Sequence, residues 1–127
     1  MSRFGDADRL ASWAALCPGN NESAGKRKSG KTRKGNAIIR YILCECANVA
    51  RNTKSSLAAK YRSLKIRKSH KKCIVAIAYK LIRIIYFMLS RREPYRDLGG
   101  DYEAMSAQKN APRWIKALIK IGMLQTA

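Results

Sequence analysis

Acidic residues are scarce in this 127-residue sequence: 8 Asp and Glu stand against 27 Lys and Arg, giving a formal net charge of +19. So strong a positive charge favours an acidic polymer as partner, nucleic acid first and a membrane surface second. Hydrophobic residues still make up 46% of the chain, too large a share for a wholly disordered basic tail. The length suits one ordinary domain. We therefore expect a folded domain with a basic surface.

Metal-binding and secretory patterns are also missing. The four cysteines, Cys17, Cys44, Cys46 and Cys73, form no CxxC pair, and the single histidine, His70, is followed by two lysines that would repel a cation. The sequence therefore predicts no metal site. It also opens without an apolar export segment, so four scattered thiols indicate a reducing, cytoplasmic location.

Long apolar runs are limited to one. The stretch from Cys73 to Leu89 is interrupted by Lys80 and Arg83, whereas a membrane-spanning helix needs about 20 predominantly apolar residues. We expect a buried helix here rather than a membrane anchor. Because apolar residues cover most of its sides, this helix should be the most buried element.

Helical periodicity predicts an all-α fold: a small basic domain of about five helices, with a glycine-rich basic loop between the first and the second. The expected helices are Phe4 to Leu16, Ala37 to about Arg51, one beginning after Ser56, Lys71 to Leu89, and Ala111 to Ile121. Asp6 is the expected N-cap of the first helix, and Pro112 helps to open the last. No stretch shows strand-like alternation. Trp13 and Trp114 fall on apolar faces and are expected in the core.

The basic loop from Asn20 to Asn36 is the sharpest local feature. It combines glycines with six cations: Lys26, Arg27, Lys28, Lys31, Arg33 and Lys34. Main-chain amides near glycine approach a phosphate closely, the cations neutralise it, and the helix that starts near Asn36 adds its positive end. The spacing does not match the GxxxxGK[ST] phosphate loop. The loop predicts phosphate binding, with a solvated, disordered loop as the alternative.

A second basic stretch, from Arg51 to Lys72, carries nine cations and no acid. Such a stretch could follow a nucleic-acid backbone, and Tyr61 within it is either a stacking ring or a core residue. We take Arg40, Lys60 and Arg62 as candidate nucleic-acid contacts beside the loop cations.

Ser23 lies in the basic loop, followed by small residues and cations. A serine hydroxyl is a poor nucleophile unless a base, a metal or a field of cations activates it, and no base lies nearby in the sequence. From spacing alone, the ordinary interpretation is a turn or cap serine.

Three strings in the sequence closely resemble a known family. They are RFGDADRLASWAALCPGNNESAGKRKSGKTRKGN from Arg3 to Asn36, KKCIVAIAYKLIRIIYFML from Lys71 to Leu89, and EPYRDLGGDY from Glu93 to Tyr102. Together they resemble the C-terminal transposase domain of the IS116/IS110/IS902 family of insertion-sequence transposases. The last helix, PRWIKALIKIGM, is similar to the closing segment of that family. We therefore expect a C-terminal transposase domain over residues 1–102, then a linker and closing helix over 103–127.

The resemblance implies DNA transposition through a serine nucleophile that attacks a DNA phosphodiester. The family's serine follows the proline after the short helix by five residues, a pattern that falls here on Pro18 and Ser23. Ser29 is the runner-up. The partners implied are DNA, a structured guide RNA, an N-terminal RuvC-like domain and further copies of the enzyme. Magnesium is expected in the intact enzyme, and no cofactor is expected in this chain.

The sequence departs from the family pattern in two ways. It contains no acidic RuvC-like domain, so we expect a truncated, DNA-binding part of a transposase that is inactive alone. Tyr79 stands where many relatives have histidine. Two alternatives remain open: a cationic helical protein that binds membrane surfaces, and a non-functional remnant.

Overall fold

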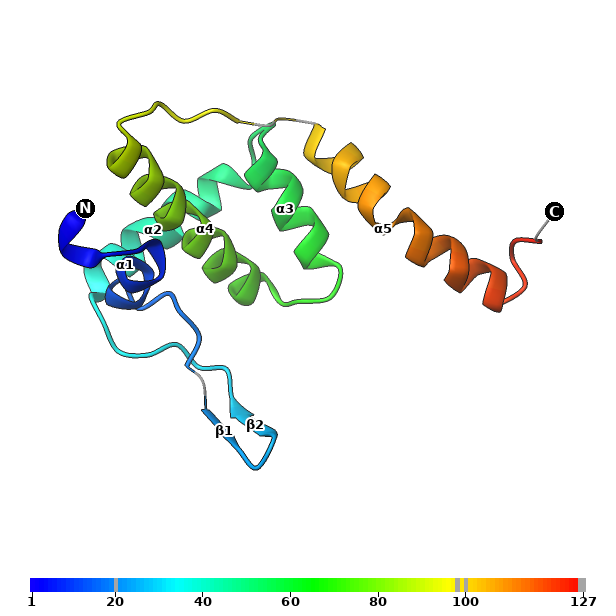
Figure 1. Cartoon of the computed structure of the whole chain (residues 1–127), viewed down its shortest axis with the longest axis horizontal. Helices are drawn as coiled ribbons and strands as arrows, with labels where there is room; N and C mark the ends of the chain where they lie inside the picture. The colour runs from blue at the N-terminus through cyan, green and yellow to red at the C-terminus, as the bar shows by residue number, and fades with distance from the viewer. Residues whose placement is uncertain (20, 98, 100, 126–127) are drawn as a thin grey trace.

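The computed structural model describes residues 1–19, 21–97, 99 and 101–125, without the side chains of residues 21, 27, 101–103 and 106. It confirms the mostly helical fold (Figure 1). A short 3-10 turn, η1, spans Ser2–Phe4. The α-helices are α1 (Ala7–Trp13), α2 (Ala37–Ala50), α3 (Ser56–Lys65), α4 (His70–Arg91) and α5 (Asp101–Lys120). The strands are β1 (Asn21–Ser23) and β2 (Lys26–Ser29).

Side-chain caps fix where the first three helices begin. Asp6 accepts a hydrogen bond of 2.7 Å from the backbone N–H of Arg9. Asn36 accepts hydrogen bonds of 3.1 Å from two amides in the first turn of α2. Ser55 accepts one of 3.3 Å from the amide of Ala58. Each oxygen satisfies a donor that a helix end leaves unpaired. Asp6 is therefore confirmed as the N-cap of α1 and Ala37 as the start of α2, but α1 spans Ala7–Trp13 and not the expected Phe4 to Leu16.

Helix α4 organises the core by packing against α1, α2 and α3. Its buried side chains lie in its first 13 residues and include Cys73, Ile77 and Ile82. Farther along, Ile85 and Leu89 are exposed. The expectation that α4 is the most buried element is therefore wrong, because α3 buries six of its ten residues. By length and composition alone, α4 could also cross a membrane, and it is the one such helix among the described residues.

Helix α5 differs from the expected last helix. It begins at Asp101 and continues through Pro112, because the preceding residues are mostly good helix formers and the proline removes only one backbone donor. Figure 1 shows α5 projecting from the helical body beyond its contact with α3. Trp114 is consequently 54% exposed. Trp13, at the end of α1, is 45% exposed. The expectation that both tryptophans lie in the core is wrong.

The segment expected to be irregular contains an antiparallel hairpin. Ser23 pairs with Lys26 across the two strands, which leaves Ala24 and Gly25 as the turn. These two residues have φ values of +51° and +73°, the positive values that a type I′ turn requires. The strands are short and polar, so they show none of the apolar alternation by which a strand is predicted. The hairpin projects from the body near α1 (Figure 1).

Candidate nucleic-acid interface

A groove of about 1350 Å³ runs between the base of the hairpin, α3 and the first two-thirds of α4. We call it the basic groove, because nine cations line it and none of its described lining residues is acidic. The cations are Lys31, Arg40, Lys60, Arg67, Lys68, Lys71, Lys72, Lys80 and Arg83. Leu16, Leu64, Val75 and Ala76 add an apolar lining.

Helix spacing explains how α4 contributes to the basic groove. Lys72, Ala76, Tyr79 and Arg83 follow one another at intervals of three or four residues and all line the groove. Such intervals place side chains on one face of a helix. The opposite side of the same helix supplies buried residues such as Ile77. One helix thus serves both the core and the cationic surface.

Three of the candidate contact residues lie in the basic groove: Lys31, Arg40 and Lys60. The other described candidates have exposed side chains and do not line it: Lys26, Lys28, Arg33, Lys34 and Arg62. The side chain of Arg27 lies outside the described residues. The structure therefore divides the predicted cations between the groove and the surfaces of the hairpin, its flanking loop and α3.

Six further groove cations were not among the candidate contacts. Four of them, Arg67, Lys68, Lys71 and Lys72, fall within the basic stretch that the sequence analysis proposed as a nucleic-acid surface. Lys80 and Arg83 stood out only as interruptions of an apolar run. Their spacing from Lys72 along the helix was the signal that could have placed them on the same surface.

Backbone contacts hold the hairpin's base against the helical body. The amide of Gly19 donates a hydrogen bond of 2.9 Å to the carbonyl of Lys31, and the amide of Asn36 donates one of 2.8 Å to the carbonyl of Trp13. A Cβ on Gly35 would lie only 2.6 Å from that Trp13 carbonyl oxygen. Glycine therefore permits a close crossing of two backbone segments here.

A side-chain bond also joins the basic groove to the end of the hairpin. Nη1 of Arg40 donates a hydrogen bond of 2.7 Å to Oγ1 of Thr32. Both residues line the groove, and Thr32 forms a bridge with Pro18 on the incoming segment. The hairpin thus starts and ends at the wall of the groove.

Ser23 is the last residue of β1 and its side chain is exposed. Its hydroxyl is therefore accessible to a large substrate, although Ser23 does not line the basic groove. Ser29, the runner-up nucleophile, has a local role, since its Oγ accepts a hydrogen bond of 3.1 Å from the amide of Lys31. Such a bond is typical of a serine in a turn.

Tyr79 links the basic groove to α1. Its hydroxyl donates a hydrogen bond of 2.6 Å to the carboxylate of Asp8, and Nη1 of Arg83 contacts both that carboxylate and, at 2.9 Å, the Tyr79 oxygen. The hydrogen bond from Tyr79, assisted by Arg83, lowers the pKa of Asp8. The same hydrogen bond, together with burial, raises the pKa of Tyr79. At neutral pH the site therefore holds a protonated tyrosine against an ionised carboxylate.

Tyr61 belongs to the core and is not a stacking platform. It is 8% exposed, and its hydroxyl lies 2.7 Å from Nδ1 of His70. The guanidinium of Arg51 lies over the ring, 5.7 Å from its centroid. These contacts join the end of α2, the middle of α3 and the start of α4, and so position the basic stretch between them.

The described residues bring no three His, Cys, Asp or Glu side chains together in a way that could hold a metal ion. Magnesium, which the resemblance implies for an intact enzyme, has no fitting ligand set in this part of the chain. We accordingly assign no chemical step to a metal here.

Comparison with known proteins confirms the resemblance over the first part of the chain. Residues 1–62 match the family model described as Transposase IS116/IS110/IS902 family. The matched region includes α1, the hairpin, α2 and most of α3. No curated protein and no solved structure matches this chain. The division into residues 1–102 and 103–127 stays a prediction.

Proposed function

We propose a DNA-binding role in transposition for this chain, whose residues 1–62 match the family model described as Transposase IS116/IS110/IS902 family. The basic groove holds the sugar-phosphate backbone, and the hairpin, whose base borders the groove, carries Ser23 next to its turn. The observation that carries this proposal is the groove itself, with nine lining cations and no acid among its described residues.

Electrostatics favour a nucleic acid in this groove. Each cation that neutralises a phosphate releases condensed counterions, and that release supplies most of the sequence-independent affinity. The long aliphatic stems of Lys68 and Lys72 let their charged ends reach phosphates at different depths. Arg40 and Arg83 are each held by a hydrogen bond, so their guanidinium groups are already oriented. The arrangement suits backbone contact and carries no base-specific pattern by itself.

Ser23 is the nucleophile in the proposed reaction. Its Oγ forms a bond to phosphorus while the bond from phosphorus to the leaving sugar oxygen breaks, and the hydroxyl proton passes through solvent to that oxygen. The product is a phosphoserine link between protein and DNA. Lys26 and Lys28, which follow on the same hairpin, stabilise the negative charge that grows on the phosphate. Guide RNA, further copies of the enzyme and a magnesium-binding domain are additional proposed partners.

A salt titration of duplex DNA binding tests the groove. With about six phosphates neutralised, the logarithm of affinity should fall with a slope of about −5 against the logarithm of salt concentration. The double substitution Lys68→Ala/Lys72→Ala should reduce the magnitude of this slope by about 2. Lys116→Ala/Lys120→Ala makes the same charge change on α5, away from the groove, and should leave the slope nearly unchanged. Equal losses in both variants would show that general charge, and not the groove, binds the DNA.

Binding to membrane surfaces is the second candidate function, because α4 is long and apolar enough to enter a bilayer. Ile85, Phe87 and Leu89 are exposed at its C-terminal half. An apolar helix face with basic neighbours binds anionic lipid surfaces. Co-sedimentation with vesicles of anionic and of neutral lipid separates the two functions: DNA binding without vesicle binding supports the first, and the reverse supports the second.

A further inference from the structure

A second cleft, of about 480 Å³, lies at the other end of α4, where the chain turns back after the helix. Ile84 and Met88 contribute apolar side chains to it, and residues 93–96 form its outer wall. We propose that this cleft binds one unstacked nucleotide of a single strand and prefers a base with an exocyclic amino group. The proposal rests on the proposed function insofar as it takes nucleic acid as the partner.

Three contacts fix the outer wall of the cleft. Helix α4 ends at Arg91, and its C-cap residue, Arg92, has a left-handed φ of 54°. The amide of Glu93 then donates a hydrogen bond of 3.2 Å to the carbonyl of Met88. The carboxylate of Asp97 accepts hydrogen bonds of 3.1 and 3.3 Å from the amide of Ser56 at the start of α3. The segment between these anchors is thereby held beside α4, so the cleft is formed before any ligand arrives.

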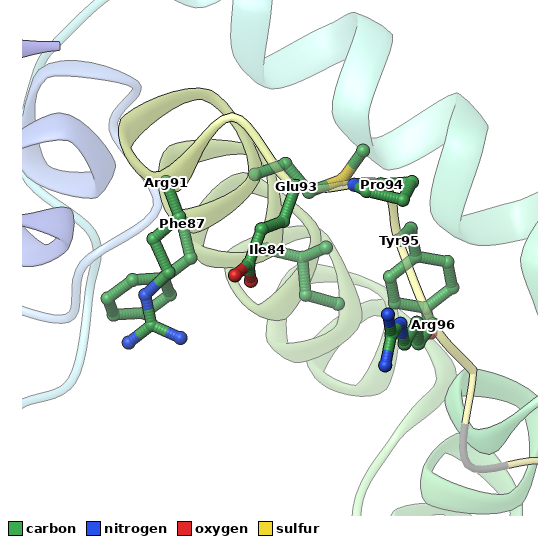
Figure 2. Close-up of a pocket in the computed structure, with 8 residues that line it drawn as sticks. Ile84, Phe87, Arg91, Glu93, Pro94, Tyr95 and Arg96 are labelled. Atoms are coloured by element: carbon green, nitrogen blue, oxygen red, sulfur yellow. The ribbon is translucent and has the colours of Figure 1, made fainter.

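Aromatic rings and arginines lie on both sides of the cleft. Figure 2 shows Phe87 and Arg91 on one side, and Tyr95 and Arg96 on the other. Phe87 and Tyr95 are 39% and 41% exposed, and the Arg91 guanidinium lies 4.9 Å from the Phe87 ring centroid. Single-stranded bases stack on aromatic rings and on arginine planes, and arginine also binds phosphate. These side chains therefore suit a base together with its phosphate.

Glu93 gives the cleft its expected preference among bases. Figure 2 shows its carboxylate between the two sides of the cleft, near Ile84. Within the described residues this carboxylate forms no ion pair, so its oxygens are available to accept hydrogen bonds. Carboxylates accept from the N4 amino group of cytosine, whereas thymine presents an oxygen acceptor at the same position. A cytosine should therefore bind better than a thymine.

The cleft's chemistry disfavours other ligands. Arg91 and Arg96 repel a cation, so a metal ion or a basic peptide is a poor fit. A free phosphate ion could contact the arginines but would leave the apolar floor and the aromatic rings without a partner. A volume of about 480 Å³ lies within the usual range for small-ligand sites, roughly 300–1,000 Å³. A single nucleotide combines the flat apolar, amino and anionic groups that this lining can contact.

Fluorescence anisotropy with labelled single strands tests the proposal, using 12-nucleotide oligomers of deoxycytidine and of thymidine. The full chain should bind the cytosine oligomer at least about five-fold more tightly. Glu93→Gln should bring the two affinities within two-fold of each other. Glu45→Gln, which makes the same charge change at an exposed site on α2, should keep the preference. Phe87→Leu should weaken binding of both oligomers about five-fold or more, because a stacking ring is lost.

The outcomes separate this inference from the proposed function. Duplex binding with the expected salt slope, combined with equal affinity for the two oligomers in the unsubstituted chain, overturns the nucleotide site alone. If the unsubstituted chain binds neither duplex DNA nor the single-stranded oligomers, both the nucleotide site and the proposed function are overturned. A preference for cytosine that Glu93→Gln leaves intact also overturns the assignment of Glu93. Thermal melting of each variant by circular dichroism verifies that it folds. The comparison of the two oligomers on the unsubstituted chain requires no variant.

Discussion

The hydroxyl of Tyr79 lies 2.6 Å from the carboxylate of Asp8, so one hydrogen bond joins α4 to α1 across 71 positions of sequence. Arg83, one turn farther along α4, contacts both groups. Tyr79 and Arg83 also line the basic groove. Tyr79 is therefore a hydrogen-bond donor that fixes one wall of the candidate interface.

Tyr79→Phe should lower the melting temperature near neutral pH, and it should have a smaller effect on the melting temperature at acidic pH. Asp8 has a lowered pKa in the folded state, chiefly because Tyr79 donates to it. The stability that Asp8 contributes is therefore present above its unfolded pKa, about 3.9, and is lost as the pH falls through its lower folded pKa. The melting temperatures of the two proteins should approach each other as the pH falls from 6 toward 3. Circular dichroism melts across this range measure the effect.

The alkaline limb has the opposite sign. The pKa of Tyr79 is raised, first by its hydrogen bond to Asp8. Its contribution to stability is fully present below the unfolded pKa, about 10, and is lost as the pH rises through the folded pKa.

Tyr86→Phe is the control for Tyr79→Phe, because Tyr86 donates to the carbonyl of Gly5 and not to a carboxylate. A constant gap between Tyr79→Phe and the unsubstituted chain from pH 6 to pH 3 would contradict the assigned bond.

Gly35→Ala should destabilise the chain by about 1–3 kcal/mol, because the added methyl group overlaps packed atoms. Its Cβ would lie 2.6 Å from the Trp13 carbonyl oxygen and 2.8 Å from the Ala15 amide nitrogen, so the backbone must move. Gly25→Ala is the comparison: its Cβ meets nothing within 4 Å, but its φ is +73°, so only the backbone conformation costs energy, about 1 kcal/mol. Urea denaturation should rank Gly35→Ala as the less stable variant, and the reverse order would contradict the close crossing.

Much of this fold could be predicted from local sequence signals. Asp6 and Asn36 are good cap residues next to apolar periodic segments, and both do cap helices. The predicted start of the last helix near Pro112 was wrong, because the cost of one proline inside a helix is smaller than the combined helix propensity of the residues before it. Trp114 misled because an apolar helix face predicts burial only when another element packs against it. A short window of sequence shows neither the helix propensity of the whole segment nor which element packs against a helix face.

The candidate site was predictable as a charge pattern but not as a shape. The sequence predicts a basic surface from Arg51 to Lys72 and a phosphate-binding loop that includes Lys31. That they share a groove with Arg83 depends on how α4 packs, which brings together residues about 50 positions apart. The hairpin was missed because positive φ at Ala24, a residue that rarely adopts it, gives no turn signal.

Asp97→Ala should destabilise the chain by about 1 kcal/mol, because the start of α3 loses an acceptor for its amide. The Asp97 carboxylate accepts from the amides of Ser56 and Gly99, and its contacts with Ser56 lower its pKa. Its contribution should therefore also be lost as the pH falls through that lowered pKa. Asp97→Asn keeps an acceptor and should lose less. Equal denaturation midpoints for all three proteins at pH 7 would show that this cap contributes nothing.

DNA held in the basic groove should also reach the hairpin. Lys31 follows β2 by two positions and lines the groove, so a strand that contacts Lys31 passes the hairpin's base. Lys26→Ala/Lys28→Ala should consequently reduce the magnitude of the salt slope for duplex DNA, by up to about 2, whereas Ser23→Ala should leave both affinity and slope unchanged because its hydroxyl carries no charge. An unchanged slope in the lysine double variant would place the DNA away from the hairpin. Ser23 could then not be the nucleophile for a strand bound in the groove, even if the groove binds DNA as proposed.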